Sequence, residues 1–506
     1  MRRCPLTVNR KRLRFTSDDA RVIARLFLPG DRRQIQRIVA RVAELPADEV
    51  DSLLGEILAN FADRHRDIES VLLDHYDDVA CHVPDGQELP KQKKLLIGSY
   101  FTMEYAVESA ALFNPSIVFA PRQEGVAAGC ARVIMSFRAT GEGHVSSLEF
   151  RSAVLTADND LVVDPVRPHL QTPELTHTIH YDKDLFGLQL LEMNVPDDPT
   201  SAGLTRFLHR GEVLSELLNR LPKSFTLRQL HKAMAEVRHG GMFDPDSTDA
   251  TFDRVRWFAG SNYEVSFGSD TEISERVVFP ISENERHGIE DARFVRFEDE
   301  GGATYYATYT AYDGETVRTQ LLETADFVDF RISTLNGRHA NSKGMALFPR
   351  KIAGKYAMIS RTDGANLYIM FSDDVRFWHS GQKLQRPYEP WELVKIGNCG
   401  SPIETEAGWI LLTHGVGPMR RYCLSATLLD RDNPFRVLGR LRQPLLSPQE
   451  GEREGYVPNV VYTCGALVHN GELIIPYAMA DEVSSVATIR LDELLAALLD
   501  SGRRAE

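Results

Sequence analysis

The sequence of 506 residues contains no run of 18 apolar residues, so no segment is long and apolar enough to span a membrane as a helix. Its six cysteines are scattered, without paired metal-ligand spacing, at positions Cys4, Cys81, Cys130, Cys399, Cys423 and Cys464. This pattern predicts reduced thiols, no disulfide framework and no metal site. The N-terminus, Met1 to Lys11, is basic but lacks the apolar stretch of a secretion signal. We therefore expect a cytoplasmic protein.

The sequence also has fewer basic than acidic residues. The chain has 58 Lys and Arg against 72 Asp and Glu, which gives a formal net charge of -14. Such a balance argues against a nucleic-acid-binding surface and suits a neutral or sugar-like ligand, while a small cationic pocket for one anion remains compatible with it. The length exceeds one ordinary core and predicts two or three structural units.

Residues 1–112 are predicted to form an N-terminal helical region. Ser17-Asp18-Asp19 is typical of an N-cap for a helix over residues 20–28, and apolar residues recur at helical spacing between residues 35 and 76. A further helix is expected over residues 95–113. Amphipathic helices of this kind favour a scaffold or an oligomer contact, and we assign them no catalytic role.

Residues 113–164 change character to short β-type runs and form the first part of a β domain. Residues 165–255 are predicted to be a helical insertion, because Leu204 to Leu221 and Leu227 to Val237 have helical periodicity. An insertion of this size either roofs a site or builds a subunit contact.

Residues 256–495 are almost continuously β, with short strands separated by Asp- and Gly-rich turns such as Asp363-Gly364. This spacing favours the blades of a radial β-repeat, and a double β-sandwich is the main competing architecture. Residues 496–506 are expected to be a polar tail.

The stretch that draws most attention is His287-Gly288-Ile289-Glu290-Asp291-Ala292-Arg293-Phe294. Adjacent carboxylates with an Arg close by can hold different pKa values, as acid chemistry near neutral pH requires. Taken alone, the stretch favours a surface turn with a local ion pair. Other segments change that balance.

Three cationic or titratable residues stand at the edges of later strands: Lys343, Arg361 and His414. Each alone is typical of a solvated strand end or a core histidine. Converging loops at one end of a toroid would bring them together around one small volume. Lys, Arg and His in such a volume make an anion site, in which the Arg fork matches phosphate oxygens.

Four segments together resemble glycoside hydrolase family 130. They are Gly288 to Arg293, Lys343 to Pro349, Gly408-Trp409 through His414-Gly415-Val416, and Gly455-Tyr456-Val457-Pro458-Asn459-Val460. The resemblance runs from about Phe113 to Leu491, interrupted by the insertion. It implies a five-bladed β-propeller, here with an added N-terminal helical region and a helical insertion. It also implies the activity of a β-mannoside phosphorylase or β-mannosidase.

The resemblance implies roles for individual residues. Asp291 sits at the aspartate of the family's Glu-Asp-Pro-Arg motif, where Ala292 replaces the usual proline, and would be the catalytic acid, acting through a sugar hydroxyl. Phosphate would be bound by Lys343, Arg361, His414 and an early arginine, Arg138. Asn114 and Asp481 resemble positions that contact sugar hydroxyls. Independently of the resemblance, the rings of Tyr309 and Tyr456 are candidate stacking faces for a sugar, and Glu290, Arg293 and Asn459 complete the residues expected to contact the substrate.

The implied reaction is phosphorolysis of a β-mannoside with inversion, which yields α-mannose 1-phosphate and needs no cofactor. The alternative is an inverting β-mannosidase, for which Glu404, Glu406 and Glu454 are candidate general bases. A third interpretation is a non-catalytic propeller that binds glycans. The expected partners are a mannoside and inorganic phosphate, and the added helices leave room for a homo-oligomer.

Overall fold

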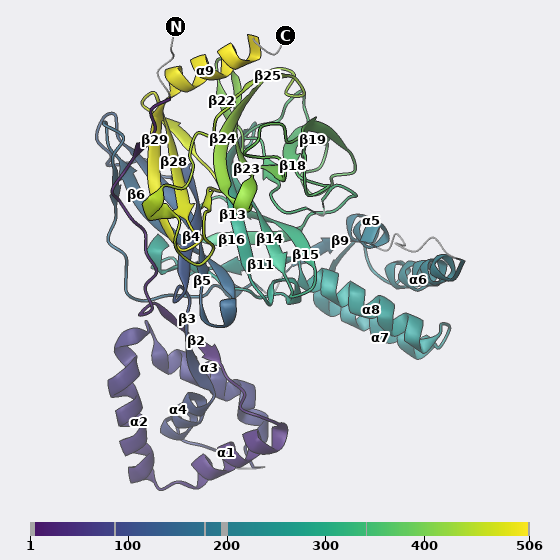
Figure 1. Cartoon of the computed structure of the whole chain (residues 1–506). Coiled ribbons are helices and arrows are strands. Elements are labelled where there is room, and N and C mark those ends of the chain that lie inside the picture. The colour runs from purple at the N-terminus through teal and green to yellow at the C-terminus, as the bar shows by residue number, and fades with distance from the viewer. Residues whose placement is uncertain (1–5, 85–87, 177–178, 194–200, 341, 504–506) are drawn as a thin grey trace.

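The computed structural model describes residues 6–84, 88–176, 179–193, 201–340 and 342–503. Within these ranges the chain is mainly β and forms five antiparallel sheets of four to six strands, together with two two-stranded sheets. Figure 1 shows the larger sheets gathered in one body, with two helical packs outside it.

The first two large sheets come from the middle of the chain. The first contains β4 (Ala111–Phe119), β5 (Ala131–Thr140), β6 (Ser146–Leu155), β7 (Leu161–Val163) and β12 (Val277–Val278). The second contains β8 (Glu174–Leu175), β11 (Tyr263–Ser266), β13 (Ile289–Asp299), β14 (Gly302–Tyr312), β15 (Val317–Thr324) and β16 (Asp329–Thr334). The rings of Phe150 and Phe294 meet edge-to-face with centroids 6.0 Å apart and join the two sheets in one core.

The other three sheets follow in chain order. The third contains β17 (Ala346–Leu347), β18 (Tyr356–Ser360), β19 (Leu367–Ser372) and β20 (Gly381–Gln385). The fourth contains β21 (Lys395–Asn398), β22 (Ile403–Thr405), β23 (Gly408–Val416), β24 (Tyr422–Leu429) and β25 (Val437–Arg440). The fifth contains β26 (Val461–Tyr462), β27 (Leu467–His469), β28 (Glu472–Met479), β29 (Val483–Arg490) and the N-terminal β1 (Asn9–Arg10). Both ends of the described chain thus meet in one sheet, where Asn9 pairs with Thr488.

The N-terminal region contains α1 (Arg32–Glu44), α2 (Ala47–Phe61), α3 (Ile68–Val79) and α4 (Lys91–Tyr100). The helix expected over residues 20–28 is wrong, because this stretch holds the strand β2 (Val22–Leu26), which pairs with β3 (Thr102–Ala106). Asp18 does accept a backbone hydrogen bond from Ala20, but in a turn rather than at a helix start. The β-branched Val22 and Ile23 then favour a strand.

The helix expected over residues 95–113 is correct only as far as Tyr100. The chain continues into β3 and then β4, where Phe113 pairs with Arg138. The residues after Tyr100 include Phe101, Thr102 and Tyr105, which are β-branched or aromatic and fit a pleated surface better than a helix.

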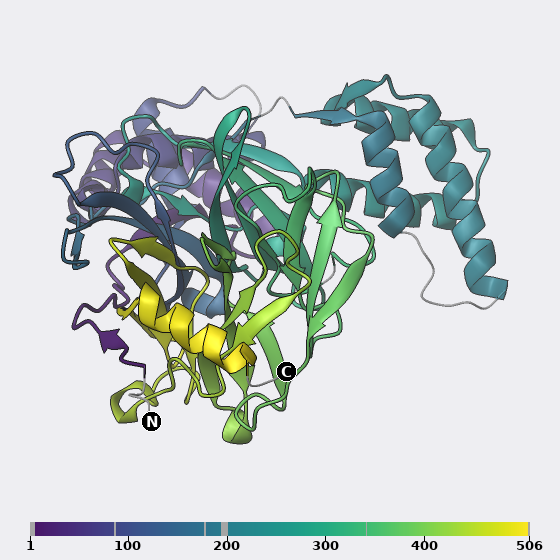
Figure 2. The same ribbon diagram turned by 90° about the horizontal axis from the view of Figure 1, so that it is seen from above.

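The insertion contains the hairpin β9 (His180–Asp182) and β10 (Ser224–Thr226) and the helices α5 (Lys183–Met193), α6 (Ser201–Asn219), α7 (Leu227–Gly240) and α8 (Pro245–Gly260). The two helices predicted within it are confirmed. Thr226 and Gln229 form a reciprocal capping box at the start of α7. The last helix runs to Gly260, beyond the expected boundary at residue 255. Figure 2 shows this helical pack standing beside the sheets, and it buries a hydrophobic core of its own.

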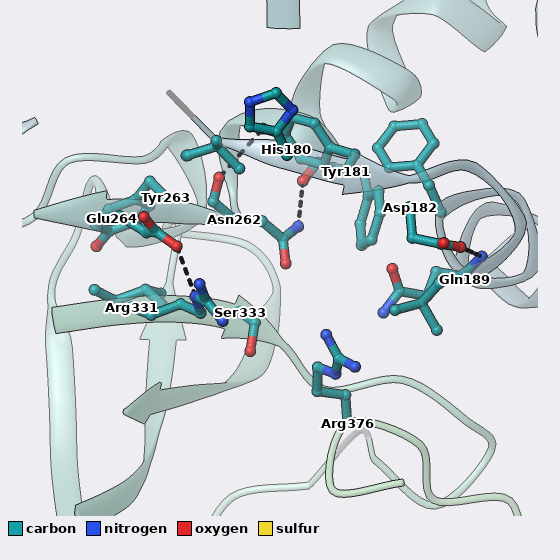
Figure 3. Close-up of a pocket in the computed structure, with 15 residues that line it drawn as sticks. His180, Tyr181, Asp182, Gln189, Asn262, Tyr263, Glu264, Arg331, Ser333 and Arg376 are labelled. Atoms are coloured by element: carbon teal, nitrogen blue, oxygen red, sulfur yellow. Dashed lines mark hydrogen bonds and ion pairs between the residues drawn. The ribbon is translucent and has the colours of Figure 1, made fainter. Parts of the chain in front are cut away.

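A cavity of about 520 Å³ lies where the insertion meets the outer strands of the second sheet. Figure 3 shows His180, Tyr181 and Gln189 of the insertion on one side of it; Asn262, Glu264, Arg331 and Arg376 line the rest. None of the residues predicted for the catalytic site lines this cavity. The insertion therefore roofs a cavity on the side of the β body.

The tail expected over residues 496–506 is wrong up to Arg503, because α9 (Leu491–Arg503) is a helix. Leu494 and Leu498 are fully buried in the core between the fourth and fifth sheets. At Gly439 of β25 a Cβ would come within 1.9 Å of the Leu498 carbonyl oxygen, so the helix packs directly on the strand backbone. Residues 504–506 lie outside the described ranges.

No helix within the described residues is long and apolar enough to cross a membrane. The cysteines of this part of the chain, Cys81, Cys130, Cys399, Cys423 and Cys464, are all free thiols. Cys4 lies outside the described residues.

Four buried charges connect the N-terminal region to the first sheet. Arg21, just before β2, forms salt bridges with Glu108 and with Glu149 of β6, the latter at 2.8 Å. Arg151 contacts the same two carboxylates at 3.0 and 2.9 Å. All four side chains are at most 5% exposed. Because these charges are buried away from water, the opposite charges of the cluster replace the hydration that each one would have in solvent.

We expect Arg21→Ala to lower the stability of the protein by about 3–5 kcal/mol, because two buried carboxylates, Glu108 and Glu149, then share one arginine, Arg151. Thermal unfolding is the measurement. The matched control is Arg41→Ala, which removes a pair with Glu44 that is 4.0 Å long and more than 70% exposed; that change should cost less than about 0.5 kcal/mol. Equal melting temperatures for the two variants would show that the cluster does not hold the N-terminal region.

Candidate active site

Asp291 lies near the start of β13 at a β-bulge, where the pairing with β14 slips between Glu290 and Arg293. Its φ is +55°, in the left-handed region that Asp and Asn tolerate better than most side chains. Asn114 occupies a corresponding place on β4, with a bulge between Phe113 and Ser116 and a φ of +48°. Bulges re-aim side chains at the rims of sheets. Here the two bulged strands bring Asn114 and Asp291 into contact.

Asp291 is surrounded by hydrogen-bond donors. Asn114 Nδ2 donates to Asp291 Oδ1 at 2.7 Å. Arg293 Nη1 donates to the Asp291 carbonyl oxygen at 2.8 Å, and its Nη2 lies 3.6 Å from Asp291 Oδ2. Arg138 Nη1, from β5, lies 3.8 Å from Asp291 Oδ1. Arg293 is itself 2% exposed and also donates to the Tyr462 hydroxyl at 2.8 Å. It therefore acts here as a buried anchor for Asp291.

These donors set the charge of Asp291. Burial alone would raise the pKa of this carboxyl, but Arg293, Arg138, the hydrogen bond from Asn114 and Lys343 together lower it below the usual value of an aspartate. In the free protein Asp291 is therefore a carboxylate at neutral pH.

Glu290 joins two of the residues predicted to bind phosphate. Lys343 Nζ donates to Glu290 Oε2 at 2.7 Å, and Arg138 Nη2 donates to Glu290 Oε1 at 3.0 Å. Lys343 is 45% exposed, so its ammonium group opens to solvent beside Glu290. The structure thus brings Lys343, Arg138, Glu290 and Asp291 together on one side of the site.

Arg361 and His414 form the other side. Arg361 Nη1 lies 3.3 Å from His414 Nε2, and because a guanidinium only donates, this imidazole nitrogen accepts. Burial, Arg361, Lys395 and Arg293 lower the pKa of His414 well below its usual value. His414 is therefore a neutral imidazole, so the expectation that it adds positive charge to an anion site is wrong, and Arg361 supplies that charge.

Asp481 lies in the turn between β28 and β29 with a φ of +52°. Burial raises the pKa of this carboxyl to about 7, with a further rise from Asp291 and Glu290 and an opposing effect of Arg138 and Arg420. Asp481 and Asp291 therefore differ in charge below pH 7, and Asp481 is the carboxyl that carries a proton.

The tyrosines and the asparagine predicted to contact sugar divide into three cases. Tyr456 is 52% exposed, and its hydroxyl lies 3.2 Å from His144 Nδ1, so its ring is available to a ligand. Asn459 accepts a hydrogen bond from Arg453 at 2.8 Å and lines a separate cavity of about 680 Å³ that includes Trp391. The expectation for Tyr309 is wrong: its ring is 1% exposed in the core of the second sheet and its hydroxyl bonds to Glu285.

Two groups at this site were not predicted as ligands from the sequence. Tyr462 of β26 accepts from Arg293, and its ring centroid lies 5.0 Å from that of His414. Asn398 at the end of β21 is 1% exposed, and neither of its side-chain polar atoms has a partner. The Gly397-Asn398-Cys399-Gly400 segment carried the available signal, because a polar residue between glycines invites close approach by a ligand. Within the described residues, no group of three or more His, Cys, Asp or Glu side chains is arranged to hold a metal ion.

Comparisons with known proteins point to one family. A family model described as beta-1,4-mannooligosaccharide phosphorylase matches residues 264–499, which include Asp291, Lys343, Arg361, His414 and Asp481. Asn114 and Arg138 precede the matched residues.

Two curated relatives are phosphorylases by name. The 1,2-beta-oligomannan phosphorylase of Thermoanaerobacter sp. is 34% identical over 227 residues, which cover 44% of this chain and 75% of the relative. The beta-1,2-mannobiose phosphorylase of Listeria innocua is 31% identical over 226 residues, which cover 43% of this chain and 62% of the relative.

Among solved structures, the Listeria innocua beta-1,2-mannobiose phosphorylase in complex with beta-1,2-mannobiose matches with a TM-score of 0.42 and 21% identity, over 77% of this chain and 92% of that one. The sequence match to the Thermoanaerobacter enzyme, which spans three quarters of that protein, and the match to the family model decide the assignment. This chain belongs to glycoside hydrolase family 130.

Proposed function

We propose that the protein is an inverting glycoside phosphorylase, which cleaves β-mannosides with inorganic phosphate and releases α-mannose 1-phosphate. The observation that carries the proposal is the placement of the anchored carboxylate of Asp291 beside the cations Lys343 and Arg138. The names of the relatives, which are mannoside phosphorylases, support the same reaction.

The chemistry follows from these groups. Phosphate attacks the anomeric carbon on the face opposite the leaving sugar, the glycosidic C–O bond breaks, and a proton moves to the leaving oxygen. Because the nucleophile comes from solution, one protein carboxyl suffices, and one displacement inverts the configuration. A β-mannoside therefore gives the α-phosphate.

The proton must be on the acid when the bond breaks. In the free protein Asp291 is ionised because Arg293, Arg138 and Lys343 lower its pKa. A phosphate anion bound to the same cations brings negative charge close to Asp291 and so raises its pKa. Phosphate also brings a proton of its own, and Asp291 can take up this proton and pass it to the leaving oxygen. Net proton uptake is zero, since the phosphate proton ends on the released sugar.

The alternative of an inverting hydrolase needs a second carboxylate as general base. Glu404 is engaged by Arg350, with contacts of 2.8 and 2.6 Å, and by Arg431 at 2.9 Å. Glu406 and Glu454 are exposed. None of the three candidate bases has a contact with the Asp291 group within the described residues, and this favours phosphate over water as the nucleophile.

We also infer that the five large sheets are the blades of a β-propeller. Five antiparallel sheets in chain order, with β1 from the N-terminus completing the last one, support this arrangement. Each large sheet contributes a residue to the proposed site: Asn114 on β4, Asp291 on β13, Arg361 after β18, His414 on β23 and Asp481 after β28.

We expect Asp291→Asn to lower kcat for mannobiose phosphorolysis by about 10²–10⁴, the usual contribution of general acid catalysis. Release of α-mannose 1-phosphate from β-1,2- and β-1,4-mannobiose, followed by ³¹P NMR with and without inorganic phosphate, is the measurement. The wild-type protein should form product only when phosphate is present.

The control for this experiment is Asp373→Asn, which removes an exposed carboxylate paired with Lys355 at 3.0 Å and should leave kcat unchanged within about twofold. Full turnover of Asp291→Asn would refute the assignment of the acid. Release of free mannose by the wild type without phosphate would instead establish a hydrolase.

A second prediction concerns Asp481. Its pKa is raised to about 7 in the folded protein, so the folded state binds a proton that the unfolded state has already lost. Its destabilising contribution therefore grows as pH rises from about 4 to about 7 and is constant above that range. Asp481→Asn removes it, so the variant should melt higher than wild type, by ~1–3 °C more at pH 8 than at pH 5.

Differential scanning calorimetry of both proteins across this pH range is the measurement. A difference in Tm that does not change with pH would mean that Asp481 ionises like an ordinary surface aspartate.

A further inference from the structure

The most unusual unused group of the site is Asn398. It ends β21, pairs with Thr413 of β23 and is 1% exposed, yet its Nδ2 and Oδ1 both lack a hydrogen-bond partner. A buried polar group without a partner has a stability cost, and a carboxamide has two such groups. A leucine has nearly the same shape and would avoid this cost, so packing gives no reason for an asparagine here.

The surroundings of Asn398 show where its partner would lie. The residue before it, Gly397, is held against the other half of the site: a Cβ there would meet His414 Cε1 at 2.3 Å and Arg361 Nη1 at 3.2 Å. On the other side, the position of a Cβ at Gly344 lies 3.8 Å from Asn398 Oδ1 and 3.8 Å from Arg293 Nη2. Gly344 directly follows Lys343 and has a φ of +85°. A Cβ at Gly344 would therefore stand between Asn398 and Arg293 in van der Waals contact with both, and its absence leaves room there, next to the backbone of Lys343.

The arginines beside Gly344 and Gly397, namely Arg293 and Arg361, each have a buried Nε group without a partner. Both are cationic donors. Together with Asn398 Nδ2 they are three unpartnered donors, a set that favours an anion. Asn398 Oδ1, in contrast, is an unpartnered acceptor on the same side chain. An acceptor in an anion site is unfavourable unless the anion itself carries a hydrogen to donate.

We propose that Asn398 binds the attacking phosphate and selects it over tetrahedral anions that carry no proton. This inference rests on the proposed function. At neutral pH inorganic phosphate includes the dihydrogen form, which can give one proton to Asp291 and keep a P–OH group; this group donates to Asn398 Oδ1 while a second phosphate oxygen accepts from Nδ2. Sulfate has the same shape but no proton at this pH, so Oδ1 faces it with repulsion. Neutral His414, whose Nε2 already accepts from Arg361, adds no competing charge.

The test is isothermal titration calorimetry of the full chain with sodium phosphate and, separately, sodium sulfate at pH 7. Asn398→Leu keeps the shape of the side chain and removes both polar atoms. We expect its Kd for phosphate to rise by about 10–100-fold, the loss expected for hydrogen bonds to a charged ligand. Its Kd for sulfate should change by less than about threefold, since the lost donor and the relieved repulsion oppose each other.

Asn398→Ser guards against a folding defect, because a hydroxyl can both donate and accept and should keep the preference for phosphate over sulfate. The matched control is Gln320→Leu. Gln320 is another fully buried carboxamide with both polar atoms unpartnered, but it lies on β15, the third strand of its sheet. This variant should bind phosphate as the wild type does.

The outcomes separate the two proposals. If the wild type binds no phosphate, the proposed nucleophile is wrong, and the role of Asn398 is wrong with it. If the wild type binds phosphate and Asn398→Leu binds it within twofold of wild type, only the role of Asn398 is overturned. Equal weakening of phosphate and sulfate in Asn398→Leu would also overturn it, because that result reports a lost donor without selection.

Discussion

A carboxylate held among sheets must be surrounded by donors, and much of the geometry of this site supplies them to Asp291. Arg293 reaches both the carbonyl and the carboxylate of Asp291 from two residues along the same strand, and Asn114 donates from β4. Neither contact would form on regular strands. The bulges in β4 and β13 place both residues in the left-handed region, where a short polar side chain is the least costly choice.

The site has two halves with different hydrogen-bond status. In one half Lys343 and Arg138 already donate hydrogen bonds to Glu290, and these groups are partly open to solvent. In the other half, around Arg361, His414 and Asn398, several buried polar atoms have no partner. An anion that enters between them would add hydrogen bonds in the second half and compete with Glu290 in the first. The electrostatic state of Asp291 would change with it, because the same cations hold its pKa down.

The sequence predicted the strands of the β body and the helices of the insertion well, because their alternation and periodicity are strong local signals. It failed at residues 20–28, 101–113 and 496–503. At the first two, a capping pattern and an apolar run were interpreted as helix, but pairing between β2 and β3, which are far apart in sequence, decided the outcome. The C-terminal helix was missed because the polar end of the chain obscured an apolar stripe, in which Leu494 and Leu498 lie one helical turn apart and are buried.

At the site, the sequence predicted which types of side chain are present, but not which of them are buried or charged. The family resemblance predicted that Asp291, Lys343, Arg138, Arg361 and His414 lie close together, and Arg361 does contact His414, but the resemblance carried no information on burial. Tyr309 was therefore mistaken for a sugar platform, and neutral His414 for a cation. Asn398 escaped notice because an unpaired amide is recognised only when the structure shows what fails to contact it.

The central claim is that Asp291 is ionised in the free protein and gains its proton only with phosphate. The most direct measurement is a ¹³C NMR titration of the aspartate carboxyl carbons, with the Asp291 signal assigned from the Asp291→Asn variant. The account predicts a carboxylate signal from pH 8 to below the usual range of an aspartate, and a shift of that titration to higher pH when inorganic phosphate is added. A carboxyl that is already protonated at pH 7 without phosphate, or one whose titration ignores phosphate, would contradict it.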